Sequence, residues 1–367
     1  MDYRRLSEDI ERWGRELGFG GMGVSAPDLS GDEERLRAWL AAGRHGGMGY
    51  MARHGLKRTR PAELVPGTRR VISARLDYLP EDGAPGAWRV LRDPRLGYIA
   101  RYALGRDYHK VLRRRLARLA ERIAAAVGGH GDVAAPGPGH AAGGRVFTDS
   151  APVLEKALAR NAGLGWMGKH TNLIARDAGS WFVLGEIYTP LPLPVAEPAR
   201  AHCGSCRACM TACPTGAIRV PWELDARRCV SYLTMEYRGS IPLGLRPRMG
   251  NRIFGCDDCQ LVCPWNRFAR VTEEKDFLPR HGLAAPDLVS LFGWSEAEFL
   301  ARTAGSALRR VGYEGWLRNI AVALGNASPS SRMRVALEAR AEYSSPLVAE
   351  HVAWALARQG RGPCRAC

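Results

Sequence analysis

Long apolar runs are missing from this sequence, and acidic residues are in short supply. The chain has 367 residues, 46% of them hydrophobic, yet no stretch of ~18 consecutive apolar residues that would cross a membrane. Its first residues run into a charged helical pattern and not into the apolar core of a secretion signal. We therefore expect a globular protein of the cytoplasm with no membrane contact and with room for two or three domains.

The charge balance is strongly basic. Asp and Glu number 37 against 53 Lys and Arg, a formal net charge of +16. Nearly all of the basic residues are arginine, because the chain holds only these lysines: Lys57, Lys110, Lys156, Lys169 and Lys275. Such a surplus attracts polyanions, and it favours nucleic acid as the partner.

Ten cysteines in a chain without an export signal argue against disulfides and for metal or redox chemistry. The first run has the spacing C-x2-C-x2-C-x3-C-P, typical of bacterial ferredoxins, and consists of Cys203, Cys206, Cys209, Cys213 and Pro214. The second run has the spacing C-x2-C-x3-C-P and consists of Cys256, Cys259, Cys263 and Pro264. Cys229 stands alone between the two runs.

In ferredoxins with two clusters, the fourth cysteine of a run ligates the other cluster. This rule predicts that one four-iron cluster is held by Cys203, Cys206, Cys209 and Cys263. It predicts that the other is held by Cys213, Cys229, Cys256 and Cys259. Each of the eight thiols is then used once, so the spacing indicates two [4Fe–4S] clusters.

Two alternatives concern the metal. A pair of four-cysteine zinc sites would require two C-x2-C pairs for each site, and neither run divides that way without an odd spacing. Cys364 and Cys367 also form a C-x2-C pair, but they lie at the C-terminus without other ligands nearby, and we expect them to be spare thiols.

Periodicity predicts an α/β (α+β) domain over residues 1–198, a ferredoxin-like two-cluster module over 199–275, and a helical tail resembling HEAT repeats over 276–367. In the first domain we expect helices over 6–17 and 107–127 and strands over 70–74 and 146–148. Ala151-Pro152 is expected to open a further helix. Segments 171–175 and 181–188 alternate like a β-hairpin.

Several long motifs resemble the epoxyqueuosine reductase family. They are Arg101-Tyr102-Ala103-Leu104-Gly105-Arg106-Asp107-Tyr108-His109, Thr148-Asp149-Ser150-Ala151-Pro152-Val153-Leu154-Glu155 and Gly163-Leu164-Gly165-Trp166-Met167-Gly168-Lys169-His170, together with both cysteine runs. The likeness covers nearly the whole chain. It implies an enzyme with cobalamin and two [4Fe–4S] clusters that reduces epoxyqueuosine to queuosine at the wobble position of tRNAs with a GUN anticodon. We expect it to work as a monomer fed by an external low-potential electron donor.

The resemblance also implies roles for single residues. Asp149 occupies the family's proton-donor position, and its pKa would have to be raised, most simply by burial against the corrin and the substrate. The contacts to cobalamin would come from Arg58, Asp149, Lys169, Asn172 and Ser231, and contacts to the modified base from Asp107, Tyr108 and His109. The simpler roles are an N-cap for Asp149, a helix-start position for His109, and an ordinary surface position for each of the other cobalamin contacts.

The family binds cobalamin without a protein ligand to cobalt. Asp107-Tyr108-His109 begins like the D-x-H-x-x-G loop that supplies such a ligand, but Leu112 stands where that loop has glycine. Two other functions are compatible with the clusters alone. Reductive dehalogenation of a small organohalide is disfavoured by the +16 charge. A plain electron carrier, or an RNA-binding protein with structural clusters, would not need the ~200 residues that precede the cysteines.

Overall fold

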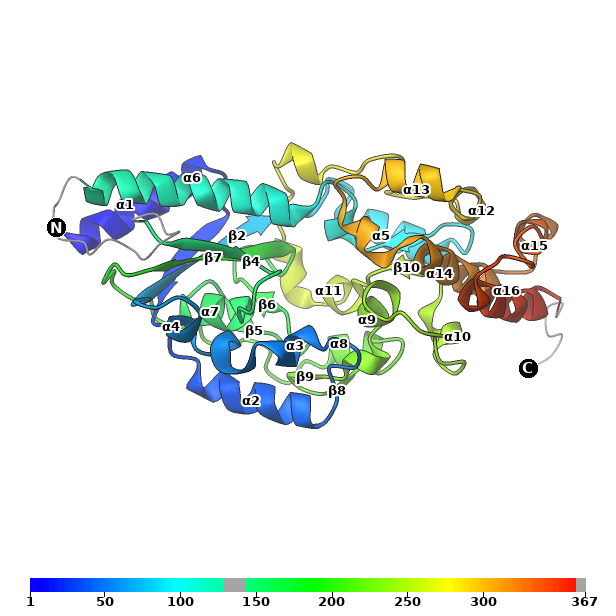
Figure 1. Ribbon diagram of the computed structural model, residues 1–367, viewed down its shortest axis with the longest axis horizontal. Coiled ribbons are helices and arrows are strands. Elements are labelled where there is room, and N and C mark those ends of the chain that lie inside the picture. Colours follow the sequence, from blue (N-terminus) through cyan, green and yellow to red (C-terminus); the bar gives the residue numbers. More distant parts are fainter. Residues whose placement is uncertain (129–142, 361–367) are drawn as a thin grey trace.

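The computed structural model describes residues 1–128 and 143–360. Most of the Gly/Pro-rich segment and both terminal cysteines, Cys364 and Cys367, lie outside the described residues. Figure 1 shows an elongated molecule, with a sheet domain at one end and the C-terminal helices at the other. No helix in the described part of the chain is both long and apolar enough to cross a membrane.

The sheet domain is built on one antiparallel sheet in the order β1-β2-β7-β4. Its strands are β1 (Gly21–Ser25), β2 (Arg70–Asp77), β7 (Phe182–Thr189) and β4 (Arg145–Thr148). The predicted strands over 70–74 and 146–148 are confirmed as β2 and β4. The predicted hairpin is wrong: β6 (Leu173–Ile174) pairs with β5 (Trp166–Met167), while β7 runs between β2 and β4.

Helices α1 (Tyr3–Glu16) and α6 (Tyr108–Gly128) cover one face of the sheet. Both correspond to predicted helices. The apolar stripe of α6 is fully buried against Ile72 and Ile187 of the sheet, through Leu112, Leu116, Leu119 and Ile123. Each leucine buried in this way stabilises the fold by roughly 1.5–3 kcal/mol. This packing fixes the N-terminal end of α6 beside the end of β4.

Helix α7 (Glu155–Asn161) packs on the opposite face, against β1, β2 and β7. Its Leu158 forms a small core with Val71, Phe147 and Tyr188. The helix begins at Glu155, so the expectation that it opens at Ala151-Pro152 is wrong. The remaining elements of this domain are α2 (Ser30–Ala41), α3 (Tyr50–Arg53), η1 (Gly55–Arg58), α4 (Pro61–Leu64), α5 (Gly83–Arg92), β3 (Tyr98–Ile99) and η2 (Arg101–Ala103).

The cysteine-bearing segment is made of short elements. They are α8 (Ala208–Ala212), β8 (Ile218–Val220), β9 (Glu223–Leu224), η3 (Ala226–Arg228), α9 (Val230–Met235), α10 (Arg246–Met249), β10 (Arg252–Phe254), α11 (Asp258–Leu261), η4 (Pro264–Phe268) and η5 (Lys275–Phe277). Helices α8 and α11 follow the first cysteines of the two runs and pack on each other. The segment is tied to the sheet domain because β10 pairs in parallel with β3.

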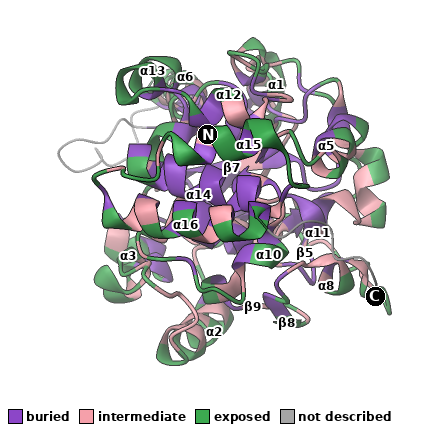
Figure 2. Ribbon diagram, turned by 90° about the vertical axis from the view of Figure 1, so that its right-hand side faces the viewer, coloured by how far each residue is buried: buried purple, intermediate pink, exposed green. Residues whose placement is uncertain are grey.

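Helices form the rest of the chain. They are α12 (Leu288–Phe292), α13 (Glu296–Arg302), η6 (Ala307–Val311), α14 (Tyr313–Asn326), α15 (Ser331–Glu338) and α16 (Pro346–Gln359). Figure 2 shows α14 buried at their centre, with exposed residues on the outer helices. Leu317, Ile320 and Leu324 of α14 pack with Val348 and Val352 of α16 within one core.

A buried arginine joins these helices to the cysteine-bearing segment. The guanidinium of Arg318 in α14 donates hydrogen bonds to the carbonyl groups of Tyr237, Gly239 and Leu233 at 2.8–2.9 Å. The neighbouring Asn319 donates to the carbonyl of Thr234 at 2.8 Å. Because charged hydrogen bonds of this kind compensate the loss of hydration, Arg318 remains buried and fixes α14 against α9.

Candidate active site and cysteine groups

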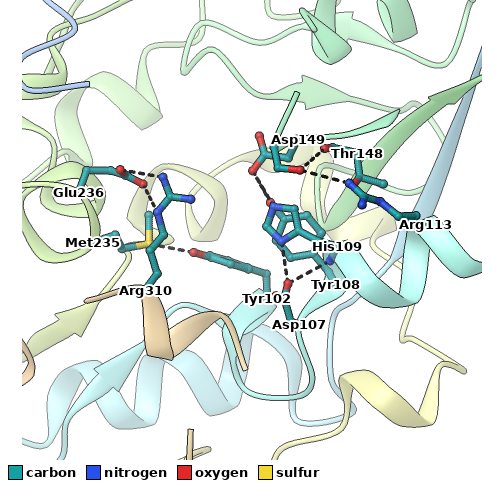
Figure 3. Close-up of polar contacts among 11 residues, drawn as sticks. Tyr102, Asp107, Tyr108, His109, Arg113, Thr148, Asp149, Met235, Glu236 and Arg310 are labelled. Carbon is teal, nitrogen blue, oxygen red and sulfur yellow. Dashed lines mark hydrogen bonds and ion pairs between the residues drawn. The ribbon is translucent and has the colours of Figure 1, made fainter. Parts of the chain in front are cut away.

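Asp149 directly follows β4, and α6 brings Tyr108 and His109 to it (Figure 3). The Tyr108 hydroxyl donates to Asp149 Oδ2 at 2.6 Å, and His109 Nε2 lies 3.3 Å from the same oxygen. The other imidazole nitrogen, Nδ1, lies 2.6 Å from Asp107 Oδ1. Asp107, His109 and Asp149 therefore form a continuous hydrogen-bonded chain, and the three residues expected near the substrate base lie beside the expected acid.

Among these three hydrogen-bonded residues, the His109 imidazole holds the proton. Burial opposes a charge on His109, but its bonds to Asp107 and Asp149 outweigh burial and raise the pKa of His109 to about 9. Burial would raise the pKa of Asp149, yet hydrogen bonds from His109 and Tyr108 and the charges of His109 and Lys156 lower it to about 2. The carboxyl group remains 49% exposed, so solvent limits the effect of burial.

We expect burial against the corrin and substrate to raise the pKa of Asp149; in the protein alone, that pKa lies below its ordinary value. The reason is the pair of donors on α6, which stabilise the carboxylate. The N-cap role for Asp149 is also excluded, because α7 begins six residues later, with Leu154 at the cap position and no side-chain cap. His109 does occupy the first turn of α6, and Leu112 is buried in that helix, so the segment is helical and not a ligand loop.

Sequence reasoning missed a set of charged groups beneath Asp149. Burial and the Asp149 charge raise the pKa of Glu155 to about 8. Glu186 of β7 is fully buried, and burial, together with Glu155 and Asp149, raises its pKa well above the ordinary value. Lys156 donates to the Asn172 side-chain oxygen at 3.0 Å. One signal was available: Glu186 is the only charged residue in the apolar strand β7.

Replacing Glu186 with glutamine should make thermal stability less sensitive to pH. Both Glu186 carboxyl oxygens lack a hydrogen-bond partner among the described residues, so the folded state keeps the group neutral while the unfolded state ionises it. A folded-state pKa raised above the unfolded value means that stability falls as pH rises beyond ~4.5, by up to ~1.4 kcal/mol per unit.

The measurement is the unfolding midpoint of wild type and Glu186→Gln at pH 5.5 and pH 8. The difference in unfolding midpoint, variant minus wild type, should be larger at pH 8 than at pH 5.5. Glu197→Gln, an exposed position, serves as the matched control and should show no such dependence. The same wild-type-to-variant difference at both pH values would contradict a neutral Glu186.

The opposite wall of the site comes from distant parts of the chain (Figure 3). Tyr102 packs edge-on against Tyr108 at 5.8 Å and donates to Met235 Sδ at 2.8 Å. Arg310 forms an ion pair with Glu236 at 2.8 Å and places its guanidinium over the Tyr50 ring. The charge of Asp149 acts on both Arg310 and Tyr50, which places them at the same site. No motif predicted Arg310, because η6 lies outside the segments that the resemblance singled out.

The residues expected to contact cobalamin occupy different environments. Arg58 is buried, donates to the Tyr50 carbonyl at 3.1 Å, and has an Nε without a partner in the described chain. Lys169 is buried and donates to the carbonyls of Gly204 and Cys206, so it holds the first cysteine loop. Asn172 and Ser231 are half-buried, and Ser231 directly follows Val230 at the start of α9. None of the four is an ordinary exposed position.

Three cysteines of the first run and one of the second lie together in the structure. We name them the outer group: Cys203, Cys206, Cys209 and Cys263. All four line one cavity of about 50 Å³, together with Lys169, Trp265 and others. Burial and the thiols of Cys263, Cys203 and Cys206 raise the pKa of Cys209. Gly204 adopts a φ of +48° in the Cys203–Cys206 turn, a conformation that favours glycine.

We name the other four cysteines the inner group: Cys213, Cys229, Cys256 and Cys259. Cys229 and Cys256 pack against the same small core. Burial and the nearby thiols of Cys229 and Cys213 raise the pKa of Cys259, and Cys213 acts in the same way on Cys229. Within residues 1–128 and 143–360, no three His, Cys, Asp or Glu side chains converge tightly enough for a single metal ion. The four thiols of the outer group line one cavity, an arrangement that suits a multi-iron cluster.

These two groups define the class of protein. Residues 202–266 match the family model described as a 4Fe-4S double cluster binding domain, so the chain is an iron–sulfur redox protein. Residues 58–150 match the model described as Epoxyqueuosine reductase QueG, DUF1730.

Curated relatives extend the match to the full length. An epoxyqueuosine reductase of Pseudomonas aeruginosa is 58% identical over 98% of this chain and 96% of that protein. The Escherichia coli enzyme is 54% identical over 98% of this chain and 91% of that protein. The chain belongs to the epoxyqueuosine reductase family of oxidoreductases.

Solved structures agree with this assignment. A crystal structure of epoxyqueuosine reductase with an epoxyqueuosine-modified tRNA-Tyr stem loop has a TM-score of 0.83 at 27% identity, covering 97% of this chain and 91% of that one. A Bacillus subtilis epoxyqueuosine reductase, described with its catalytic aspartate loop swung out of the active site, has the same TM-score at 28% identity over the same shares. The predicted family, and the predicted iron–sulfur domain with it, are confirmed.

Proposed function

We propose that this protein reduces the epoxide of epoxyqueuosine to queuosine at the wobble position of tRNAs with a GUN anticodon, and that Asp149 delivers the proton. The proposal rests on one observation: Asp107, His109 and Asp149 are hydrogen-bonded in series in a protein that also has a double-cluster domain. The solved relative with an epoxyqueuosine-modified tRNA stem loop supports the substrate. The basic surplus of +16 supports a polyanionic partner.

Removal of the epoxide oxygen sets the requirements of the site. Converting an epoxide to an alkene takes two electrons and two protons, and the oxygen leaves as water. Asp149 has a pKa of about 2 and carries no proton at neutral pH, whereas His109 with a pKa of about 9 does. We therefore assign His109 as the group that supplies a proton to Asp149, which passes it to the epoxide oxygen. Tyr108 holds the carboxyl group in place.

Cobalamin is the cofactor that the family resemblance implies, and the side chains expected to contact it fit such a group. Arg58 offers a buried Nε without a partner among the described residues, and Asn172 and Ser231 offer an amide and a hydroxyl. Such groups suit the phosphate and amide substituents of cobalamin. Lys169 would hold the outer cysteine loop and contact the cofactor. Bound cobalamin would supply a cobalt centre that accepts single electrons and passes them to the substrate carbon.

The remaining assignments follow from this reaction. Residues 1–198 would hold cobalamin and the modified base, residues 199–275 the two clusters, and residues 276–367 the tRNA stem. Two clusters, each held by one cysteine group, would pass single electrons from an external low-potential donor. We propose that the protein acts as a monomer in the cytoplasm, where tRNA is modified.

Expression in an Escherichia coli strain that lacks its own epoxyqueuosine reductase tests this function. Nucleosides from the tRNA of that strain are analysed by mass spectrometry. The proposal predicts that epoxyqueuosine disappears and queuosine accumulates when the chain is expressed. Persistence of epoxyqueuosine, with folded and iron-loaded protein in the cells, would contradict it.

The rate of conversion should fall as pH rises above about 9, because deprotonated His109 no longer supplies a proton. Asp107→Asn removes the partner that most raises the pKa of His109, so the fall should begin at lower pH. In His109→Gln the rate should no longer show this fall at high pH, and it should be ~10²-fold lower than in wild type. An unchanged profile in both variants would remove His109 from the proton path.

A further inference from the structure

The outer group contains the most exposed of the described cysteines, whereas all four inner cysteines are half-buried. Among the eight described cysteines, only Cys206 is exposed. The inner group lies toward the active site, because Cys229 precedes α9, and Met235 of that helix bonds to Tyr102 next to Tyr108. An electron carrier from outside would therefore meet Cys206 of the outer group first.

Cys206 shares its cavity with His202, Ala208, Pro264 and Trp265, so segments 200–208 and 264–268 lie beside it. We name these two segments the entry face; they contain three arginines and no Asp or Glu. Arg200, Arg207 and Arg267 are exposed, and none of them forms an ion pair within the described chain. Because the charge of the entry face is not compensated locally, it attracts an acidic partner over roughly a Debye length.

The entry face also has an apolar centre. Phe268 is 41% exposed, and the Arg267 guanidinium lies 4.6 Å from the centre of its ring. Trp265 packs at 5.9 Å from Phe268 and at 5.6 Å from His202, and it lines the cavity of the outer group. Exposed aromatic rings inside a basic rim are suited to a small, transient protein interface of the kind that redox partners form.

We propose that the entry face docks a small acidic protein that carries single electrons, and that this carrier reduces the outer cluster. In each encounter the carrier loses one electron and the outer cluster gains it, so two encounters supply one epoxide reduction. The inference rests on the proposed function for the fate of the electrons. An RNA would also contact the arginines and stack on the aromatic rings, whereas only an electron carrier requires access to the exposed Cys206 thiol.

Reduction by a purified acidic flavodoxin, followed anaerobically by stopped-flow absorbance, tests the entry face. The double variant Arg200→Glu/Arg267→Glu should slow cluster reduction by about tenfold at low salt and weaken flavodoxin binding in titration calorimetry by a similar factor. A second variant, Arg207→Glu, should also slow cluster reduction by flavodoxin. Arg4→Glu/Arg5→Glu changes the same charge in α1, far from α8 in Figure 1, and should leave both values unchanged.

Dithionite separates this proposal from the proposed function. As a small reductant it needs no docking, so it should reduce the clusters of all variants equally, and a failure of epoxyqueuosine conversion with dithionite would concern the proposed function alone. Equal slowing in the α1 control, or an unchanged rate in the entry-face variants, would overturn the docking proposal. The docking proposal would also be contradicted if the variants weakened only tRNA binding, or if neither an acidic flavodoxin nor an acidic ferredoxin reduced the wild type.

Discussion

Asp149→Asn should lower epoxyqueuosine conversion by ~10²–10⁴-fold, the usual contribution of a positioned acid. The amide keeps the shape of the side chain and still accepts a hydrogen bond from Tyr108, but it no longer relays a proton from His109 to the epoxide oxygen. Conversion is measured by mass spectrometry of nucleosides after anaerobic incubation with modified tRNA. Iron content and tRNA affinity should equal those of wild type.

The control for this variant is Asp9→Asn, which makes the same change in α1 away from the site. It should convert epoxyqueuosine at the wild-type rate. If Asp149→Asn retained full activity with intact clusters, Asp149 would not be the acid, and His109 would have to donate directly.

Cys213→Ala should remove about half of the iron, even though Cys213 lies in the first run. In the structure this thiol belongs with Cys229 and Cys259 of the inner group, so its loss should destabilise the inner cluster. Iron is measured per chain after anaerobic reconstitution, together with the visible absorbance of the clusters.

Double variants test which cysteines hold the same cluster. Cys213→Ala/Cys259→Ala should lose no more iron than Cys213→Ala alone, because both cysteines hold the same cluster. Cys213→Ala/Cys203→Ala should lose nearly all of the iron, because the two changes remove different clusters. The reverse result would mean that the first run holds one cluster by itself.

Local spacing explains why the sequence predicted the cysteine groups. Tight x2 turns bring successive thiols to one side, and a proline after the last cysteine directs that residue elsewhere. The structure accordingly gathers Cys203 with Cys263, and Cys213 with Cys229 and Cys259. The amphipathic period likewise predicted a helix over 107–127, which corresponds to α6.

Long-range packing explains what the sequence did not predict. The pKa of Asp149 is set by donors from α6, about 40 positions earlier in the chain. Arg310 and Glu236 join the site from elements that share no motif with it. The hairpin prediction failed because alternation shows that β7 is a strand but not which strands flank it; β7 lies between β2 and β4.

The most direct test of the account is one anaerobic reaction that contains the iron-loaded protein, cobalamin, a low-potential reductant and tRNA bearing epoxyqueuosine. Nucleoside mass spectrometry then measures the product. The account predicts queuosine in wild-type reactions with cobalamin, none when cobalamin is left out, and almost none with Asp149→Asn. Intact clusters and bound cobalamin without any queuosine would contradict the assignment of tRNA as the substrate.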